Sequence, residues 1–147
     1  MFEWTIQAMS KAHATENDVW EIWTDVASWP KWDQDLEWAA LDGEFKTGTK
    51  GKLKPKGWFK SYFRITAVEN KKYFCNESKM PWTKVIFSHS VAPREESAVQ
   101  IKHHVRVTGL LAPLLFFTLR NKLKQELPKA VSKLASHAES KNQSSKL

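Results

Sequence analysis

A tryptophan-rich segment between residues 16 and 32 constrains the fold of this chain more than any other feature. Apolar side chains recur at the i, i+3, i+4 and i+7 positions of one helical face: Val19, Ile22, Trp23 and Val26. Pro30 ends this pattern because it lacks an N–H donor and disfavours helical backbone angles at the preceding residue. We therefore expect a short helix over residues 16–24 and at most one further helical turn near residues 27–32.

Alternating apolar and polar residues predict strands on both sides of that segment. Residues 2–13 alternate cleanly and predict a first strand. Beyond residue 35, short runs separated by turn residues predict six more strands, over 36–42, 49–54, 58–68, 72–79, 82–91 and 98–108. The last run has one apolar and one basic face, which is typical of an antiparallel sheet with one buried side.

The C-terminal part of the chain predicts a single long helix. Leucine and alanine form a nearly continuous stripe from residue 110 to about residue 139. Pro113 is acceptable in the first turn, whereas Pro128 should kink the helix. Residues 140–147 are small and polar, so we expect a disordered tail. The sequence therefore predicts one α+β domain over residues 1–139, followed by that tail.

The residues around the tryptophan-rich segment resemble a known family. They match a "VW…DvanWpkWd" pattern followed by a glycine-containing loop, at Val19, Trp20, Asp25, Val26, Trp29, Pro30, Trp32, Asp33, Gly43, Phe45, Gly48 and Thr49. This pattern resembles the polyketide cyclase/dehydrase-like branch of the START-type helix-grip (SRPBCC) superfamily. The resemblance implies a helix-grip fold, in which a curved antiparallel sheet of about seven strands wraps around the long C-terminal helix and two short helices follow the first strand.

The resemblance also implies an apolar cavity for a lipid-like, polyketide-like or other hydrophobic small molecule. Composition agrees, because eight Trp and eight Phe in 147 residues exceed what a core of this size usually requires. Some of these rings should line a cavity or form an exposed patch. Of the two tryptophans that flank Pro30, we expect Trp29 to anchor the turn and Trp32 to be partly exposed near the mouth.

Strand parity predicts which side chains face this cavity. If Val105 points inward, hairpin pairing brings alternate residues of the neighbouring strands to the same side. The expected lining from the strands is Phe59, Phe63, Ile65, Phe74, Asn76, Ser78, Val85, Phe87, His89, Ile101, His103 and Val105. From the helix we expect Leu111, Leu114, Leu115 and Thr118. Core packing is the plain alternative for each aliphatic residue in this set.

His89 and His103 are the candidates for chemistry. They become cross-strand neighbours if the intervening turn is centred near residue 96, and an imidazole can act as an acid, a base or a metal ligand. Without a third ligand at fixed spacing, two histidines predict no metal site. The sequence also lacks a phosphate-binding glycine loop or a nucleophile motif, so we expect no cofactor. Cys75 is expected to behave as a small buried hydrophobe.

The net charge of +7 is partly concentrated in a predicted hairpin. Six lysines fall within fifteen residues without an intervening acid: Lys46, Lys50, Lys52, Lys54, Lys56 and Lys60. Such a face can meet an anionic membrane or an acidic partner, or it can be a solvated edge that blocks aggregation. Interleaved stacking aromatics are missing apart from Trp58, so we expect no nucleic-acid partner.

Three function classes therefore remain open. The leading one is a binding or carrier protein for a hydrophobic small molecule. The second is a cyclase or dehydratase that uses His89 and His103. The third is a membrane- or protein-interaction module, which requires the lysine-rich hairpin and the apolar run 110–119 to share one surface. A single cysteine and no leader-like start predict a cytoplasmic protein. Residues 145–147 match a peroxisomal Ser-Lys-Leu signal, for which chance is the alternative.

Overall fold

A seven-stranded antiparallel sheet is the frame of the computed structural model, which describes residues 2–146. The strands are β1 Glu3–Ala12, β2 Leu36–Leu41, β3 Lys50–Pro55, β4 Ser61–Glu69, β5 Tyr73–Met80, β6 Thr83–Glu95 and β7 Ala98–Gly109. Their order across the sheet is β1-β7-β6-β5-β4-β3-β2. The predicted number of strands and their meander connectivity are therefore confirmed.

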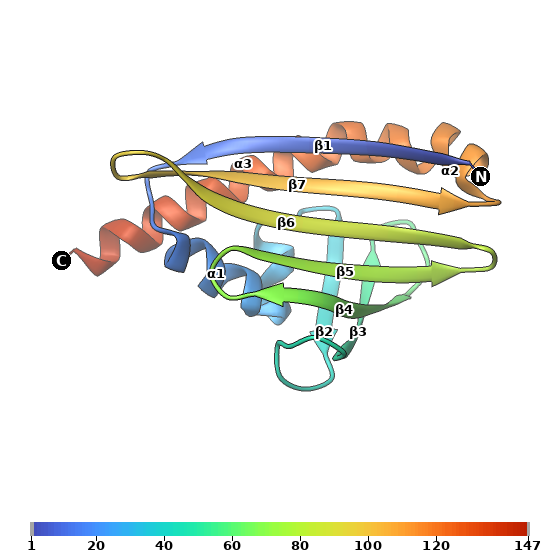
Figure 1. The fold of residues 1–147 in the computed structure, drawn as a ribbon, viewed down its shortest axis with the longest axis horizontal. Coiled ribbons are helices and arrows are strands. Elements are labelled where there is room, and N and C mark those ends of the chain that lie inside the picture. Colours follow the sequence, from blue (N-terminus) through green and yellow to red (C-terminus); the bar gives the residue numbers. More distant parts are fainter. Residues whose placement is uncertain (1, 147) are drawn as a thin grey trace.

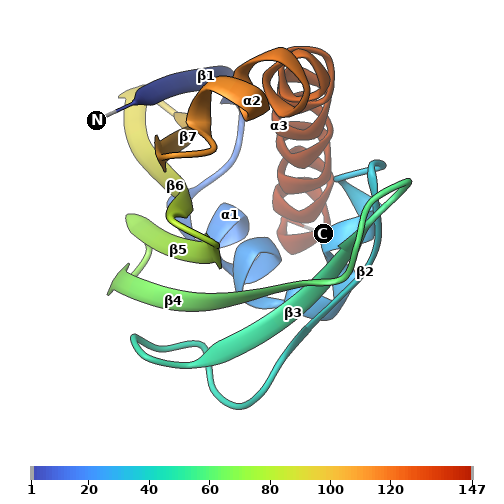
Figure 2. The same cartoon turned by 90° about the vertical axis from the view of Figure 1, so that its right-hand side faces the viewer.

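The sheet curls around a long C-terminal helix, α3 (Leu119–Ser145), so that β1 and β2, at its two edges, lie on either side of it (Figures 1 and 2). One stripe of α3 faces the sheet and is buried: Leu127, Ala130, Val131, Leu134, Ala135 and Ala138. Alanine and valine predominate there, which allows the helix to approach β1 and β7 closely.

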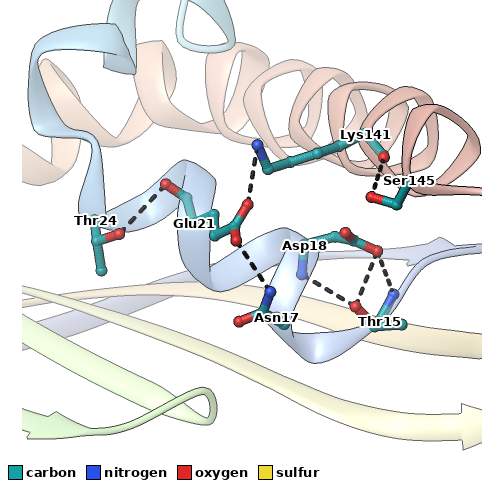
Figure 3. Close-up of polar contacts among 7 residues, drawn as sticks. All are labelled: Thr15, Asn17, Asp18, Glu21, Thr24, Lys141 and Ser145. Carbon is teal, nitrogen blue, oxygen red and sulfur yellow. Dashed lines mark hydrogen bonds and ion pairs between the residues drawn. The ribbon is translucent and has the colours of Figure 1, made fainter.

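The predicted helix over residues 16–24 is confirmed as α1 (Glu16–Thr24). Its start is fixed by a capping box, in which the Thr15 hydroxyl accepts from Asp18 N and the Asp18 carboxylate accepts from Thr15 N (Figure 3). A 3₁₀ helix, η1 (Val26–Lys31), contains Pro30 and follows α1 directly. Together α1 and η1 fill the curl of the sheet at the end opposite α2 (Ala112–Phe117).

The C-terminal helix differs from its prediction in two ways. It is divided into α2 and α3 at Thr118, where the side chains of Thr118 and Asn121 donate to the carbonyls of Leu114 and Phe117. Such bonds compete with the helical ladder and bend helices. Pro128, by contrast, lies inside α3 without ending it.

The second difference concerns the expected disordered tail. Residues 140–145 continue α3, so the prediction is wrong for them. Contacts from distant parts of the chain hold this last stretch in place. Lys141 pairs with Glu21 of α1 at 3.0 Å (Figure 3), and Asn142 donates to the backbone oxygen of His13 at 3.3 Å. Residue 147, and with it part of the Ser-Lys-Leu match, lies outside the described residues.

The β6–β7 hairpin sets the register of the interior. Its turn is at residues 96–97, so His89 lies directly opposite His103, as predicted. β6 ends four residues later than expected, at Glu95, and includes Pro93. The proline is tolerated there because β5 begins only opposite Ser90, and the missing N–H therefore breaks no ladder bond on that side.

Candidate ligand-binding site

The inward face of the sheet carries most of the predicted lining residues. In β6 and β7 the residues Val85, His89, Ile101, His103 and Val105 are buried, whereas their outward neighbours are more exposed. Phe63, Ile65, Phe74 and Asn76 of β4 and β5 are buried as well, and so is Leu115 of α2. Ser78, Phe87 and Leu111 are half-buried. The burial of these side chains agrees with the predicted parity of the strands, and their role in lining a ligand cavity stays a prediction.

Three predicted lining residues lie outside the interior. Phe59 is 79% exposed because β4 begins only at Ser61, which leaves Phe59 in the β3–β4 turn. Leu114 and Thr118 are exposed because the short helix α2 turns Ala112 and Leu115 inward instead. The expectation that these three side chains face the cavity is wrong.

Packed aromatic rings occupy the interior near α1. Trp23 contacts Phe74 edge to face at 5.5 Å between ring centroids, and Trp29 stacks on Phe63 at 5.7 Å. Trp29 also donates its indole N–H to the carbonyl of Trp23 at 2.9 Å, which fixes the angle between α1 and η1. Phe63 and Phe74 therefore serve as core at this end.

Trp32 is buried beside Trp29, and its predicted partial exposure is wrong. Its ring lies 5.6 Å from that of His103, because the turn of η1 directs both tryptophans toward the sheet. The local sequence does not indicate that Trp32 is buried, because a packing partner such as His103 is distant in the sequence.

The two histidines form the polar part of the inner wall. Their rings meet edge to face with centroids 4.7 Å apart, and His89 stacks on Phe74 at 3.9 Å. His103 Nε2 accepts a hydrogen bond from the indole N–H of Trp23 at 3.2 Å. His89 Nδ1 lies 3.4 Å from the carbonyl oxygen of Phe74, which only a protonated nitrogen can satisfy.

Burial keeps both imidazoles neutral. Desolvation lowers the pKa of His89 from 6.5 to about 3, although its bond to Phe74 acts in the other direction. Desolvation, followed by the neighbouring His89, also lowers the pKa of His103 well below its ordinary value. Neutral imidazoles hydrogen-bond well but are weak bases at such pKa values.

Among the described residues, two buried side-chain atoms have no hydrogen-bond partner, and both belong to this interior. They are the indole Nε1 of Trp32 and the amide oxygen Oδ1 of Asn76. Asn76 lies opposite Phe87 in the sheet. This pair is two residues further along the strands than the pair Phe74 and His89, on the side nearer to α2. An unpaired buried polar group costs about 1–3 kcal/mol, so each is a ready partner for a bound polar group.

The interior is less completely sealed toward α2. Five apolar side chains pack there against the second, smaller core cluster yet remain only partly buried: Met80, Phe87, Leu111, Leu119 and Leu123. They come from β5, β6, the β7–α2 link and α3, and they surround the end of the interior that contains Asn76. The interior is therefore less completely packed near α2 than near α1.

Several solved structures have the same architecture. An aromatase/cyclase, Zhui, from a Streptomyces species matches with a TM-score of 0.79 and 11% identity over 94% of each chain. Norcoclaurine synthase from Thalictrum flavum matches with a TM-score of 0.71 and 13% identity over 92% of this chain and 86% of that one. Ara h 8.0201 matches with a TM-score of 0.65 and 13% identity, over 92% and 99%.

This chain has the helix-grip fold. The resemblance that the tryptophan-rich segment suggested is thereby confirmed at the level of architecture. No protein-family model and no curated protein sequence matches the chain. At such low identity the helix-grip neighbours establish the fold alone, so function must be argued from the site.

Two surface hollows lie outside the helix-grip interior. One, of about 240 Å³, is lined mainly by polar residues of α1, η1 and α3, together with Trp32. The other, of about 370 Å³, lies at the β5–β6 turn beside Trp82. Within residues 2–146, no three His, Cys, Asp or Glu side chains gather in a way that would hold a metal ion, and no helix is long and apolar enough to cross a membrane.

Sequence reasoning missed the two tryptophans that complete the polar wall. Trp23 was assigned to a helical face and Trp32 to the mouth, whereas both rings contact His103. Trp23 and His103 are 80 residues apart in the chain, so their contact produces no recognisable pattern in the local sequence. The tryptophan excess itself was the available signal.

Proposed function

We propose that this protein binds a hydrophobic small molecule carrying a hydrogen-bond donor, in the interior between the sheet and α3. The observation that carries the proposal is Asn76 Oδ1, a buried acceptor without a partner in a largely apolar wall. A ligand hydroxyl or amine that reaches this oxygen recovers the free energy lost by its burial. Phe87 and Val105 lie beside Asn76 on the neighbouring strands. Apolar contact with them supplies the remaining free energy of binding.

The helix-grip neighbours support this class of ligand. Norcoclaurine synthase has a structure in complex with dopamine and hydroxybenzaldehyde, which are small hydroxylated aromatic molecules. A binding or carrier role is the form of the proposal that the site favours. The cyclase alternative receives less support, because the pKa values of His89 and His103 lie far below the neutral range in which a general acid or base works best.

A matched pair of probes tests the proposal. 2-Naphthol and 2-methylnaphthalene have nearly the same shape, but only the first donates a hydrogen bond. We expect calorimetric titration to show that the wild-type protein binds 2-naphthol at least about tenfold more tightly. Asn76→Leu should remove that preference while it retains binding of 2-methylnaphthalene.

Asn70→Leu, at an exposed position in the β4–β5 turn, is the matched control and should leave the preference unchanged. Equal affinity of the wild-type protein for the two probes would contradict the role of Asn76. Failure of both probes to bind would contradict the proposed function.

A further inference from the structure

The end of the molecule that carries α2 exposes large apolar side chains from three separate segments, residues 55–60, 78–84 and 108–124. We call these segments the α2 end. The exposed side chains are Trp58 (40%), Phe59 (79%), Trp82 (77%), Leu110 (61%), Leu114 (61%) and Phe117 (72%). Single exposed apolar residues are ordinary, but a group of this size at one end of a molecule marks a binding surface.

Hydrogen bonds hold the three segments together. Leu110 N donates to the carbonyl of Trp82 at 2.8 Å, which joins the β7–α2 link to the β5–β6 turn. Lys122 Nζ donates to the carbonyl of Lys56 at 2.9 Å, which joins α3 to the β3–β4 turn. Figure 2 looks onto this end, with α2, the β5–β6 turn and the β3–β4 hairpin all toward the viewer. The three segments therefore lie at the same end of the molecule.

Trp82 occupies a position where a large side chain is costly. It forms the β5–β6 turn with Pro81, and its φ of 53° lies in the left-handed region that favours glycine. This backbone conformation is unfavourable for a bulky residue. The fold gains little packing in return, since the ring points into solvent. Lys71 and Ser97 have a similar positive φ in the other hairpin turns, so the large exposed ring is what distinguishes Trp82 and makes it available to a partner.

The charge of the whole protein is concentrated at the same end. The three segments contain seven Lys or Arg residues and no Asp or Glu. That number equals the net charge of +7 of the chain, so the remainder holds acids and bases in equal number. The basic residues of the α2 end are Lys56, Lys60, Lys79, Lys84, Arg120, Lys122 and Lys124. Lys122 pairs with Asp35 at 3.2 Å, and the other six residues supply positive charge to this surface, which therefore suits a partner that is both apolar and anionic.

Lys79 and Lys84 lie directly opposite each other in the β5–β6 hairpin, immediately beside Trp82. Both are exposed, and both line the hollow of about 370 Å³ at this turn. Like charges on directly opposed residues repel each other and weaken a hairpin. An anion between the two ammonium groups removes this repulsion, and a phosphate has the required charge and acceptors.

We propose that the α2 end docks onto the surface of a lipid bilayer that contains anionic phospholipids. Trp82, Leu114 and Phe117 enter the interfacial layer, while Lys79 and Lys84 contact lipid phosphates. A bilayer fits better than a folded protein partner, because the apolar side chains are at the tips of separate segments and the lysines flank them with flexible stems. This inference does not depend on the proposed interior ligand.

Vesicle co-sedimentation tests the proposal. We expect the protein to bind vesicles of phosphatidylcholine with one third phosphatidylglycerol, and to bind vesicles of phosphatidylcholine alone at least tenfold more weakly. Added salt should weaken binding to the anionic vesicles, because the exposed lysines are screened. Absence of binding to the anionic vesicles would overturn the proposal, and so would equal binding to both kinds.

Two variants separate docking from folding. Trp82→Gly removes the ring and relieves the positive φ, so the melting temperature should stay the same or rise while vesicle affinity falls about tenfold. Lys84→Gln should weaken binding about fivefold, and only to anionic vesicles. The matched controls are Met9→Ser on β1 and Lys133→Gln on α3, both at exposed positions away from the α2 end. They should change binding by less than twofold.

The same variants exclude a self-association surface. If sedimentation velocity shows a dimer that Trp82→Gly converts to a monomer, a second copy of the chain occupies the α2 end and the proposal is wrong. If Lys133→Gln weakens vesicle binding as much as Lys84→Gln does, attraction depends on overall charge, which also contradicts docking through this surface.

Discussion

At the scale of single residues, the interior combines a closely packed apolar wall with a few polar groups of defined state. His89 and His103 are neutral, Trp23 satisfies the Nε2 of His103, and Asn76 presents an acceptor that no side chain or backbone group within residues 2–146 satisfies. Each of these properties follows from the inward parity of β5, β6 and β7. Substitutions on the two faces of one strand should therefore differ sharply.

Val105→Asp tests the parity directly. Val105 is fully buried between Phe87 and Ile6 in the sheet, so an unpaired carboxylate there should cost several kcal/mol of the free energy of unfolding or prevent folding. Arg106→Asp removes an exposed ion pair with Glu3 and should cost about 1 kcal/mol or less. Chemical denaturation measures both, and similar losses would refute the parity.

Stability should fall at mildly acidic pH because of the two histidines. The pKa of His89 is about 6.5 in the unfolded chain and about 3 in the native protein. At any pH between these two values, the unfolded chain therefore binds a proton at His89 that the native protein does not. The free energy of unfolding therefore decreases as the pH drops below about 6.5, by up to about 1.4 kcal/mol per pH unit for each histidine. His103 acts in the same direction.

Asp33 partly opposes this loss. Burial raises its pKa from 3.8 to about 6, so in that range the native protein binds the extra proton and gains stability as the pH falls. Urea denaturation at several pH values between about 7.5 and 5 should still show a net decrease. The double variant His89→Gln, His103→Gln should show a flatter profile. A wild-type profile that is flat or rises toward acid would contradict the neutral state of the pair.

At the scale of elements, helix α1 is defined by its own sequence more than any other part of the fold. The apolar face predicted it from residue 16 to residue 24, and the capping box of Thr15 and Asp18 is the physical cause of its start (Figure 3). Replacing the cap by alanine should therefore have a measurable and local cost.

Thr15→Ala should lower the free energy of unfolding by about 1 kcal/mol, because it leaves Asp18 N without its acceptor at the helix start. Thr24→Ala, at the other end of the same helix, removes only an exposed bond to Glu21 and is the matched control. Thermal denaturation with circular dichroism measures the difference. A cost for Thr24→Ala that equals that of Thr15→Ala would show that the cap contributes nothing specific.

Features that depend on contacts between residues distant in sequence could not be predicted from local sequence patterns. Alternation fixed the strands and, through a single turn, placed His89 opposite His103. The break between α2 and α3 depends on side-chain bonds at Thr118 and Asn121, and the last turns of α3 depend on contacts with α1 and His13. The Asn76 side chain was correctly predicted to face inward, but its lack of a partner becomes visible only with the neighbouring strands in place.

At the scale of the whole molecule, the two ends of the curled sheet have different properties. Rings of α1, η1 and the sheet fill the interior at one end, whereas the α2 end is less sealed, basic and apolar at its surface. A hydrophobic molecule that enters at the α2 end reaches Asn76 before it meets the aromatic cluster. The interior site that we propose for a ligand is therefore nearer to the surface that we propose to contact lipid than to the aromatic cluster's end of the molecule.

Amide chemical-shift mapping of the ¹⁵N-labelled protein with 2-naphthol tests the central claim most directly, because it locates the bound probe. The account predicts that the largest shift changes occur at the inward-facing residues Asn76, Phe87 and Val105, with smaller changes at their outward neighbours. Changes confined to the hollow beside Trp82, or to the hollow between Glu21 and Lys141, would contradict an interior ligand site.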